Sequence, residues 1–176
     1  ADGGDTGNVN LDWISVPFAP AQAKYEAENA KLSGGASTNE DHWFYSGSAF
    51  ADGFGTAGAE AQFQVEVPAA GTYNVSLRYA NGSGSTKTVS LFANGVKDSQ
   101  LSLASPGANW NIWQDKTEPV SLNAGTNTVS VKYDAGDTGG VNLDRLLVSA
   151  SAIIPAASET NLLDNPGFER NASFNS

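Results

Sequence analysis

Two glutamates separated by one residue are the most distinctive chemical feature of the chain. They are Glu26 and Glu28 in the segment YEAENAKLSGG, where residues 25–30 are expected to form a strand. Alternate residues of a strand project from the same face, so the two carboxylates would lie about 7 Å apart at the backbone and repel each other. Calcium, which takes about six to eight oxygen ligands, would neutralise such a pair. The alternative is two solvated glutamates on an edge strand.

A third carboxylate, Asp144, lies in the closing segment VNLDRLLV, where the apolar pattern changes phase. The pattern runs on odd-numbered residues before Asp144 and on even-numbered residues after it, and the same change occurs at Asp12 in a similar segment. A β-bulge at Asp144 would explain the change, because a bulge adds one residue to a strand and redirects its side chains. If the first and last strands are neighbours, Glu26, Glu28 and Asp144 converge on one calcium site.

A catalytic role for the two glutamates is the alternative from another functional class. Inverting glycosidases hold two carboxyl groups about 6.5–9.5 Å apart, so the spacing alone permits it. A catalytic pair must flank a substrate cleft, however, whereas alternate residues of one strand face the same way. His42 is the only histidine and is interpreted as a surface or packing residue, so no Ser-His-Asp set is identified.

Tryptophans outside the best strand patterns indicate a second kind of chemistry. The segment NWNIW places Trp110 and Trp113 in a Gly-, Asn- and Pro-rich region, and HWFY at 42–45 adds further aromatic side chains. An exposed indole is a flat apolar surface on which a sugar ring can stack, while the sugar hydroxyl groups seek polar side chains. Core packing is the alternative interpretation for at least half of these aromatics. The polar neighbours of the right type are Arg78, Asn81 and Asn111.

The elements that must position these residues are strands. Period-two alternation marks 61–67, 72–80 and 127–133, and further strands are expected at 25–30, 88–94, 117–122 and 141–149. Tight turns are expected at 68–71 and 123–125. No convincing amphipathic helix is present, so the sequence predicts an all-β fold, a sandwich or jelly roll.

Two segments of thirteen residues nearly repeat each other near the two ends of the chain. GDTGNVNLDWISV at 4–16 and GDTGGVNLDRLLV at 136–148 are identical at nine positions, which makes coincidence the weaker explanation. Residues 1–16 are therefore interpreted as the end of an upstream copy of the same module. The other expected units are a connector at 17–23, a complete module at 24–149, a linker at 150–160 and the start of a further β-sandwich module at 161–176.

Composition excludes several classes of protein. The net charge of −10 argues against nucleic acid as a partner, because phosphate binding needs a basic surface. The absence of cysteine excludes disulfides and thiolate metal sites, and no run of residues is apolar enough to span a membrane. The chain contains no methionine and is interpreted as a mature product or a fragment. A secreted, extracellular protein is expected.

The chain resembles carbohydrate-binding module family 35 and the related family 6 over about residues 24–149. The motifs that carry the resemblance are YEAENAKLSGG, YSGSAFADGFG, FQVEVPAAGTYNVSLRYANG, LFANG, the W..W pair and VSLNAGTNTVSVKYDAGDTGGVNLDRLLV. It implies a β-jelly roll with bound calcium and no catalysis of its own, attached to a secreted bacterial enzyme that degrades or remodels polysaccharide. It also implies that Glu26, Glu28 and Asp144 hold the calcium, with backbone carbonyls near 45–47 completing the shell.

The resemblance further implies a sugar site among the loops at one end of the sandwich. Trp110 would stack on the sugar, with Tyr45 as the opposing aromatic. The implied polar contacts are Arg78 and Asn81, and the candidate ligands of a second calcium are Asn39 and Asp41.

One departure from the family pattern concerns the closing loop. Many members have an asparagine two residues before the Asn of NLD, and the upstream segment has it as Asn8, but this copy has Gly140. Loss of the amide removes two donors and an acceptor, so the affinity or the choice of sugar is expected to differ.

The sequence therefore predicts a non-catalytic, calcium-dependent module that binds oligo- or polysaccharide for an attached enzyme, next to further modules of the same chain. Two alternatives stay open: a catalytic glycosidase or lyase domain, and a structural spacer whose sugar site has decayed. The sugar is open among uronic acids, α-glucans, galactosides and mannans.

Overall fold

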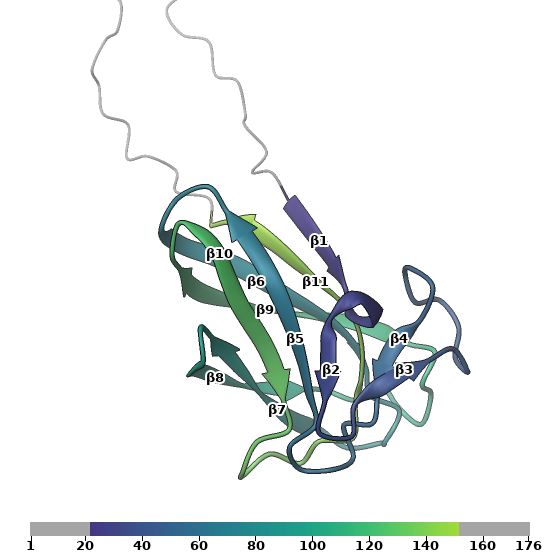
Figure 1. Ribbon diagram of the computed structural model, residues 1–176. Helices are drawn as coiled ribbons and strands as arrows, with labels where there is room; N and C mark the ends of the chain where they lie inside the picture. The colour runs from purple at the N-terminus through teal and green to yellow at the C-terminus, as the bar shows by residue number, and fades with distance from the viewer. Residues whose placement is uncertain (1–21, 152–176) are drawn as a thin grey trace, which may run out of the picture.

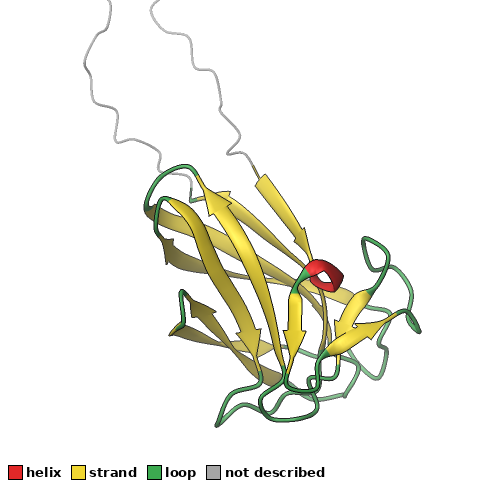
Figure 2. Cartoon of the chain, in the orientation of Figure 1, coloured by secondary structure: helices red, strands yellow, loops and turns green. Residues whose placement is uncertain are grey.

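The computed structural model describes residues 22–151, which form two antiparallel sheets packed face to face (Figures 1 and 2). The first sheet has the order β3 (Ser37–Asn39), β4 (Phe50–Asp52), β11 (Asn142–Ala150), β6 (Gly71–Ala80) and β9 (Trp113–Leu122), and β1 (Gln22–Glu26) also pairs with β11. The second has the order β2 (Lys31–Ser33), β5 (Glu60–Val67), β10 (Gly125–Lys132), β7 (Lys87–Ala93) and β8 (Val96–Leu103). The all-β sandwich expected from the sequence is confirmed.

The alternating residues of the predicted strands face each other between the two sheets. Phe63, Val65 and Val67 of β5 are buried there, together with Val129 and Val131 of β10. The intervening residues of these strands are mostly polar and point outward. Their alternation is therefore the pattern of strands with one buried face.

Connections between strands often cross from one sheet to the other. The turn at 68–70 carries the chain from β5 in the second sheet to β6 in the first, and the turn after β9 carries it back to β10. A two-residue hairpin, by contrast, joins β7 to β8 through Asn94 and Gly95, which have φ values of 51° and 80°. Positive φ at both central residues is the geometry that Asn-Gly hairpins favour.

β11 is bordered by three strands, and this arrangement positions the candidate metal ligands. β6 pairs along one edge of β11, while β1 pairs along the other edge with Glu26 opposite Arg145. The register between β11 and β6 shifts between Leu143 and Arg145, so Asp144 is the extra residue of a bulge. The predicted bulge and the predicted neighbourhood of the first and last strands are both confirmed.

The first predicted strand, at 25–30, is wrong in its second half. β1 ends at Glu26, and the chain then forms a short 3-10 helix, Ala27–Asn29, before β2 begins at Lys31 (Figure 2). The reason is that β1 belongs to one sheet and β2 to the other, so the chain has to turn between them. Glu26 and Glu28 consequently do not project from one face of a strand, as their spacing had predicted.

Other differences concern strands with weak apolar patterns. Trp113 begins β9 instead of lying in a loop, and the short strands β2, β3 and β4 were not predicted. β8 was also missed, because only Leu101 and Leu103 of its eight residues are buried. The remaining predicted strands are confirmed within a few residues.

The predictions for residues 1–16 and 161–176 lie outside the described residues. Of the predicted connector at 17–23, Gln22 and Ala23 already belong to β1, and Ala150 of the predicted linker ends β11. Within residues 22–151 no helix is long and apolar enough to cross a membrane.

Candidate functional site: a carboxylate network and an aromatic loop cluster

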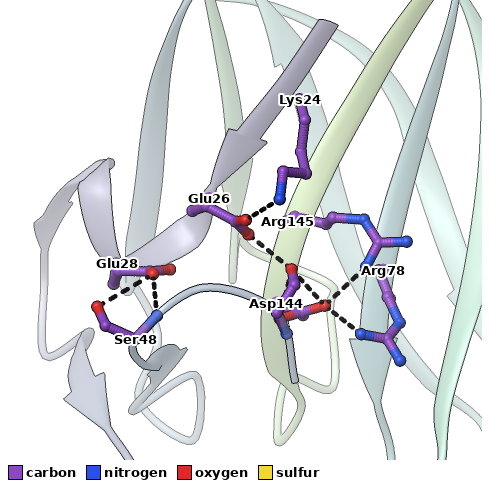
Figure 3. A network of polar contacts seen from close by, with 8 residues as sticks. Lys24, Glu26, Glu28, Ser48, Arg78, Asp144 and Arg145 are labelled. Atoms are coloured by element: carbon purple, nitrogen blue, oxygen red, sulfur yellow. Dashed lines mark hydrogen bonds and ion pairs between the residues drawn. The ribbon is translucent and has the colours of Figure 1, made fainter. Parts of the chain in front are cut away.

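Asp144 is the centre of a polar network at the bulge (Figure 3). Its side chain is fully buried, and Oδ2 lies 2.5 Å from Nη1 of Arg78 and 3.1 Å from Nη1 of Arg145. Oδ1 accepts a hydrogen bond from the backbone N–H of Ser46 at 2.7 Å. A buried carboxylate needs such partners, because an unpaired charge away from water is strongly unfavourable. The network therefore fixes the loop at Ser46 onto β6 and β11.

Glu26 joins the same network from β1. Its Oε2 accepts a hydrogen bond from the hydroxyl of Ser46 at 2.7 Å, and Oε1 lies 2.5 Å from Nζ of Lys24. Burial raises the pKa of the Glu26 carboxyl, but the hydrogen bonds from Lys24 and Ser46 together with the nearby cations outweigh it, so that the pKa is lowered overall. Glu26 is thus an anion held by a lysine and a serine.

Glu28 lies beside Glu26 but has no cation of its own within the described part of the chain. Its Oε1 accepts the backbone N–H of Ser48 at 2.8 Å, whereas Oε2 is buried without a hydrogen-bond partner. Both carboxyl groups surround Gly47: a Cβ there would lie 2.1 Å from Oε1 of Glu28 and 3.3 Å from Cδ of Glu26. The positive φ of Gly47, 72°, also favours glycine.

These residues fit a calcium site in part. Two adjacent carboxylates, one with an orphaned buried oxygen, form the hard-oxygen donor set that calcium prefers. However, the two oxygens of Asp144 are occupied by Ser46 and two arginines. Among residues 22–151 no group of three or more His, Cys, Asp or Glu side chains is arranged to hold a metal ion. Asp144 and Glu26 share one polar network through Ser46, whereas Glu28 lies beside it and bonds to Ser48.

Trp110 lies at the end of the sandwich where β6 leaves the first sheet. Its indole is half-buried, and Gly82 packs so closely against it that a Cβ there would lie 2.6 Å from Cγ of the ring. The His42 ring lies within 6° of parallel to it, with centroids 6.1 Å apart. His42 also stacks on the buried Phe50, with centroids 5.5 Å apart. His42 is thus a packing residue, as expected, and it supports Trp110.

Tyr45, the predicted opposing aromatic, packs elsewhere. Its ring contacts Phe50 and the edge of Trp113, with centroids 5.4 and 6.4 Å apart. Trp113 is half-buried instead of fully buried, lies under the guanidinium of Arg78, and donates from Nε1 to the carbonyl of Trp43 at 2.7 Å. Trp113 is therefore a half-buried residue that holds the loop at 40–49.

Two residues predicted to contact sugar, Asn81 and Arg78, bond instead to other parts of the protein. Asn81 is fully buried, and its amide donates to the carbonyls of Ser85 and Leu103, both at 2.9 Å. Arg78 binds Asp144 and donates to the carbonyl of Phe44 at 3.0 Å. Neither side chain presents its donors beside Trp110 in this arrangement. Both position the loops of the candidate sugar site instead.

The two candidate ligands of a second calcium belong to a turn. Asn39 Oδ1 accepts the backbone N–H groups of Glu40 and Asp41 at 2.7 and 3.1 Å, and its amide donates to Asp52. Asp41 is exposed, and its Oδ1 lies 3.6 Å from Nε2 of His42. These contacts are those of an Asx turn, so the geometry does not support a second metal site.

Gly140 lies at the same end of the sandwich as Trp110. Two residues after it, Asn142 pairs with Ala80, and two residues after Ala80 comes Gly82, which contacts Trp110. A Cβ at Gly140 would meet only Cε of Lys87, at 3.8 Å. Space for the side chain that this copy lacks is therefore present, next to the half-buried Lys87, which no sequence motif indicated.

A groove on the side of the sandwich lies away from Trp110. It has a volume of about 480 Å³ and is lined by Lys24, Tyr25, Glu26, Asn29, Ala30, Lys31, Gln62, Phe63 and Gln64. The candidate sugar site, in contrast, is a surface formed by loop side chains. The groove has no half-exposed tryptophan, so Trp110 is the better candidate for stacking on a ring.

Comparison with known proteins decides the family. The model of the family described as "Carbohydrate binding module (family 35)" matches residues 23–150. The chain belongs to carbohydrate-binding module family 35. The resemblance found in the sequence motifs is thereby confirmed, and the chain is a carbohydrate-binding module of a non-catalytic family.

Relatives of this family 35 module are parts of larger enzymes. A 1,6-alpha-glucosyltransferase of Sporosarcina globispora is 60% identical over 173 residues, which cover 98% of this chain but only 14% of the relative. The chain thus spans about one seventh of that relative's length. A cycloisomaltooligosaccharide glucanotransferase of Paenibacillus, solved with cycloisomaltoheptaose, has a TM-score of 0.67 and 38% identity over 70% of this chain and 18% of that one.

A solved family 35 module from Clostridium thermocellum matches almost end to end. It has a TM-score of 0.68 and 26% identity, covering 74% of this chain and 99% of that structure. The family 35 sandwich therefore stands as a unit of its own in that protein, and residues 22–151 contain the same unit here.

Gly82 and the supporting role of His42 beside Trp110 were not expected from the sequence. Gly82 gives room for the indole of Trp110, and His42 supports it from the loop before β4. Asn111 was expected to contact sugar, and its Oδ1 accepts the backbone N–H of Trp43 at 2.6 Å. The aromatic segments at 42–45 and 110–113 were the signal that could have linked these two loops.

Proposed function

We propose that this family 35 module binds α-1,6-linked glucan for an attached glucan-modifying enzyme, with Trp110 as the ring on which a glucose unit stacks. Family membership supports carbohydrate binding, and the half-buried indole of Trp110 is the observation that carries the choice of site. Amide side chains and Lys87 lie around this end of the sandwich. A flat apolar ring bordered by a few polar groups is the usual composition of a small-ligand site.

The class of glycan is proposed from the relatives. The 60% identical relative is named as a 1,6-alpha-glucosyltransferase, and the Paenibacillus relative was solved with cycloisomaltoheptaose, a ring of α-1,6-linked glucose. An enzyme that works on such glucans gains from a module that holds the same polymer nearby, because tethering raises the local concentration of substrate. Since glucan polymers do not cross membranes, we propose that the module works outside the cell.

We also propose that calcium binds between Glu26 and Glu28. The buried, unpartnered Oε2 of Glu28 and the convergence of both carboxyl groups at Gly47 support this proposal. The hydroxyl of Ser46 and the carbonyls near 45–47 are further oxygen donors on the same loop. Calcium there would hold the loop at 40–49, which carries His42 behind Trp110, so that metal and sugar binding would be linked through one segment.

Affinity electrophoresis of the full chain tests the function. Native gels containing a soluble α-1,6-glucan should retard the protein, whereas gels containing β-mannan or polygalacturonate should not. Equal mobility in all gels would contradict glycan binding and favour a spacer module. Release of reducing sugar by the isolated chain would instead favour a catalytic domain. Retardation only by polygalacturonate or mannan would keep carbohydrate binding but overturn the proposed glycan.

A further inference from the structure

Two neighbouring aromatic side chains are unusually exposed. Trp43 is 70% exposed and Phe44 is 73% exposed, both in the loop between β3 and β4. Ile112, 40% exposed, lies between Asn111 and Trp113, both of which bond to the backbone of Trp43. We call Trp43, Phe44 and Ile112 the Trp43 patch. Contiguous apolar side chains on a surface usually mark a binding site, because their exposure to water is unfavourable.

The backbone beneath the Trp43 patch is held on both sides. The N–H of Trp43 donates to Oδ1 of Asn111 at 2.6 Å, and its carbonyl accepts from Nε1 of Trp113 at 2.7 Å. The carbonyl of Phe44 accepts from Nη2 of Arg78 at 3.0 Å. Two residues further on, the N–H of Ser46 binds the buried Asp144. The two exposed rings therefore stand on a fixed loop, which lowers the entropy lost when a ligand binds.

Phe44 has a backbone conformation that an aromatic residue rarely adopts. Its φ is +68°, in the left-handed region, where glycine and asparagine are the favoured residues. Packing does not account for this conformation, since the ring is largely exposed. Strained residues of this kind are concentrated at functional sites, where the surrounding structure holds them in place. Here the carbonyl of Phe44 is held by Arg78 while its ring stays exposed.

The Trp43 patch adjoins the candidate sugar site. His42, the residue before Trp43, is the ring parallel to Trp110, and Asn111, the residue after Trp110, binds the backbone of Trp43. The two loops supply the amides of Asn109 and Asn111 and the exposed carboxylates of Glu40 and Asp41, and both kinds of group can bond to sugar hydroxyl groups. Aromatic rings on adjoining loops suit successive units of one glycan chain.

We propose that Trp43 and Phe44 form a second stacking surface, which extends the site at Trp110 so that the module binds a longer stretch of a glucan chain. This inference rests on the proposed function. It assigns Trp110 to the first glucose unit that is bound, and the Trp43 patch to units further along the same chain. Short oligosaccharides then use Trp110 alone, and only longer ones gain from Trp43 and Phe44.

Calorimetry of the full chain with linear isomaltooligosaccharides, from the disaccharide to the heptasaccharide, separates the two surfaces. Wild-type affinity should rise with length. Trp43→Ala should remove most of that rise, about tenfold in the affinity for the heptasaccharide if a glucose unit stacks about as well as a nucleobase does. Its affinity for the shortest oligosaccharide that binds should stay within about twofold of wild type, because the contacts at Trp110 are unchanged.

Two further variants control for folding and for general surface effects. Phe44→Gly introduces a residue that readily adopts positive φ, so the variant should fold at least as stably as wild type. It should lose part of the rise in affinity with oligosaccharide length. Val96→Ala removes another side chain with 70% exposure, at the hairpin between β7 and β8, and should change no affinity.

Each of the following results would contradict the second stacking surface, and each has a different cause. If Trp43→Ala and Phe44→Gly bind all lengths as wild type does, the second surface is absent while the proposed function stands. If Trp43→Ala weakens short and long ligands equally, Trp43 belongs to the first site. If Trp43→Ala changes only the oligomeric state in solution, the patch binds protein. If wild type binds no glucan of any length, the proposed function itself has failed.

Discussion

Arg78 on β6 and Asp144 on β11 form an ion pair at the β-bulge, with Nη1 of the arginine 2.5 Å from Oδ2 of the aspartate. The same arginine bonds to the carbonyl of Phe44 and lies over the ring of Trp113. The same aspartate binds the backbone of Ser46. This one pair therefore connects the centre of the first sheet with the loop that carries the exposed aromatic side chains.

Arg78→Ala should lower the free energy of unfolding by about 3 kcal/mol, because it leaves a fully buried carboxylate with fewer partners. Urea denaturation measures this change. Lys116→Ala is the matched control: it breaks a partly exposed pair with Glu118 on the same sheet and should cost less than about 1 kcal/mol. Equal effects of the two substitutions would show that the pair at the bulge has no special role.

Calcium should raise the melting temperature of the full chain, and a chelator should lower it again. An ion that binds only the folded state at a hundredfold excess over its dissociation constant adds about 2.7 kcal/mol. Glu28→Gln should abolish the calcium-dependent shift, because Glu28 supplies the unpartnered buried oxygen. Glu66→Gln, at an exposed position of β5, should keep it. If the melting temperature of wild type is the same with calcium and with chelator, the metal proposal is refuted.

Gly140→Asn should strengthen glucan binding if the restored amide reaches the sugar. The φ of 71° at this position is tolerated by asparagine, and a Cβ has room there, so the protein should remain folded. Gly139→Asn is the contrast, because a Cβ at that position would lie 2.3 Å from the carbonyl oxygen of Phe54. We expect Gly139→Asn to destabilise the protein clearly. Unchanged affinity of a stable Gly140→Asn variant would place this position outside the site.

Gly82→Ala should weaken glucan binding although it leaves the indole of Trp110 in the sequence. The added methyl group would lie 2.6 Å from the ring, so Trp110 has to move. Intrinsic fluorescence should report the displaced indole, and calorimetry the loss of affinity. Gly84→Ala offers a comparison in the same loop, since a Cβ there meets nothing within 4 Å, although its φ of 77° makes some loss of stability expected. Full affinity in Gly82→Ala would mean that the position of Trp110 is unimportant.

The sequence predicts the strands well where alternation is strong and the bulge where alternation changes phase. Residues 61–67 and 72–80 each bury every second residue, so their pattern is unambiguous, and the phase change at Asp144 has a single simple explanation. β8 could not be recognised, because most of its residues are polar and exposed at the edge of the second sheet.

The candidate site was predicted less completely than the fold. The proximity of Glu26 to Asp144 was predicted from the sequence, but the break after Glu26 was not, because it depends on β1 and β2 belonging to different sheets. Asn81 and Arg78 were assigned to sugar although their partners are Leu103, Asp144 and Phe44. A pattern shows that a polar side chain is present, whereas its direction depends on loops that meet only in the folded chain.

The most direct test of the central claim is calorimetry of the full chain and of Trp110→Ala with linear isomaltooligosaccharides. Wild type should bind, and Trp110→Ala should lose binding while it remains folded, with a smaller loss of stability than Trp113→Ala, because the Trp113 ring also donates to the carbonyl of Trp43 and lies under Arg78. Trp113→Ala should mainly destabilise, by about 2–3 kcal/mol, less than a fully buried tryptophan. Equal affinity of Trp110→Ala and wild type for the same oligosaccharide would contradict this account.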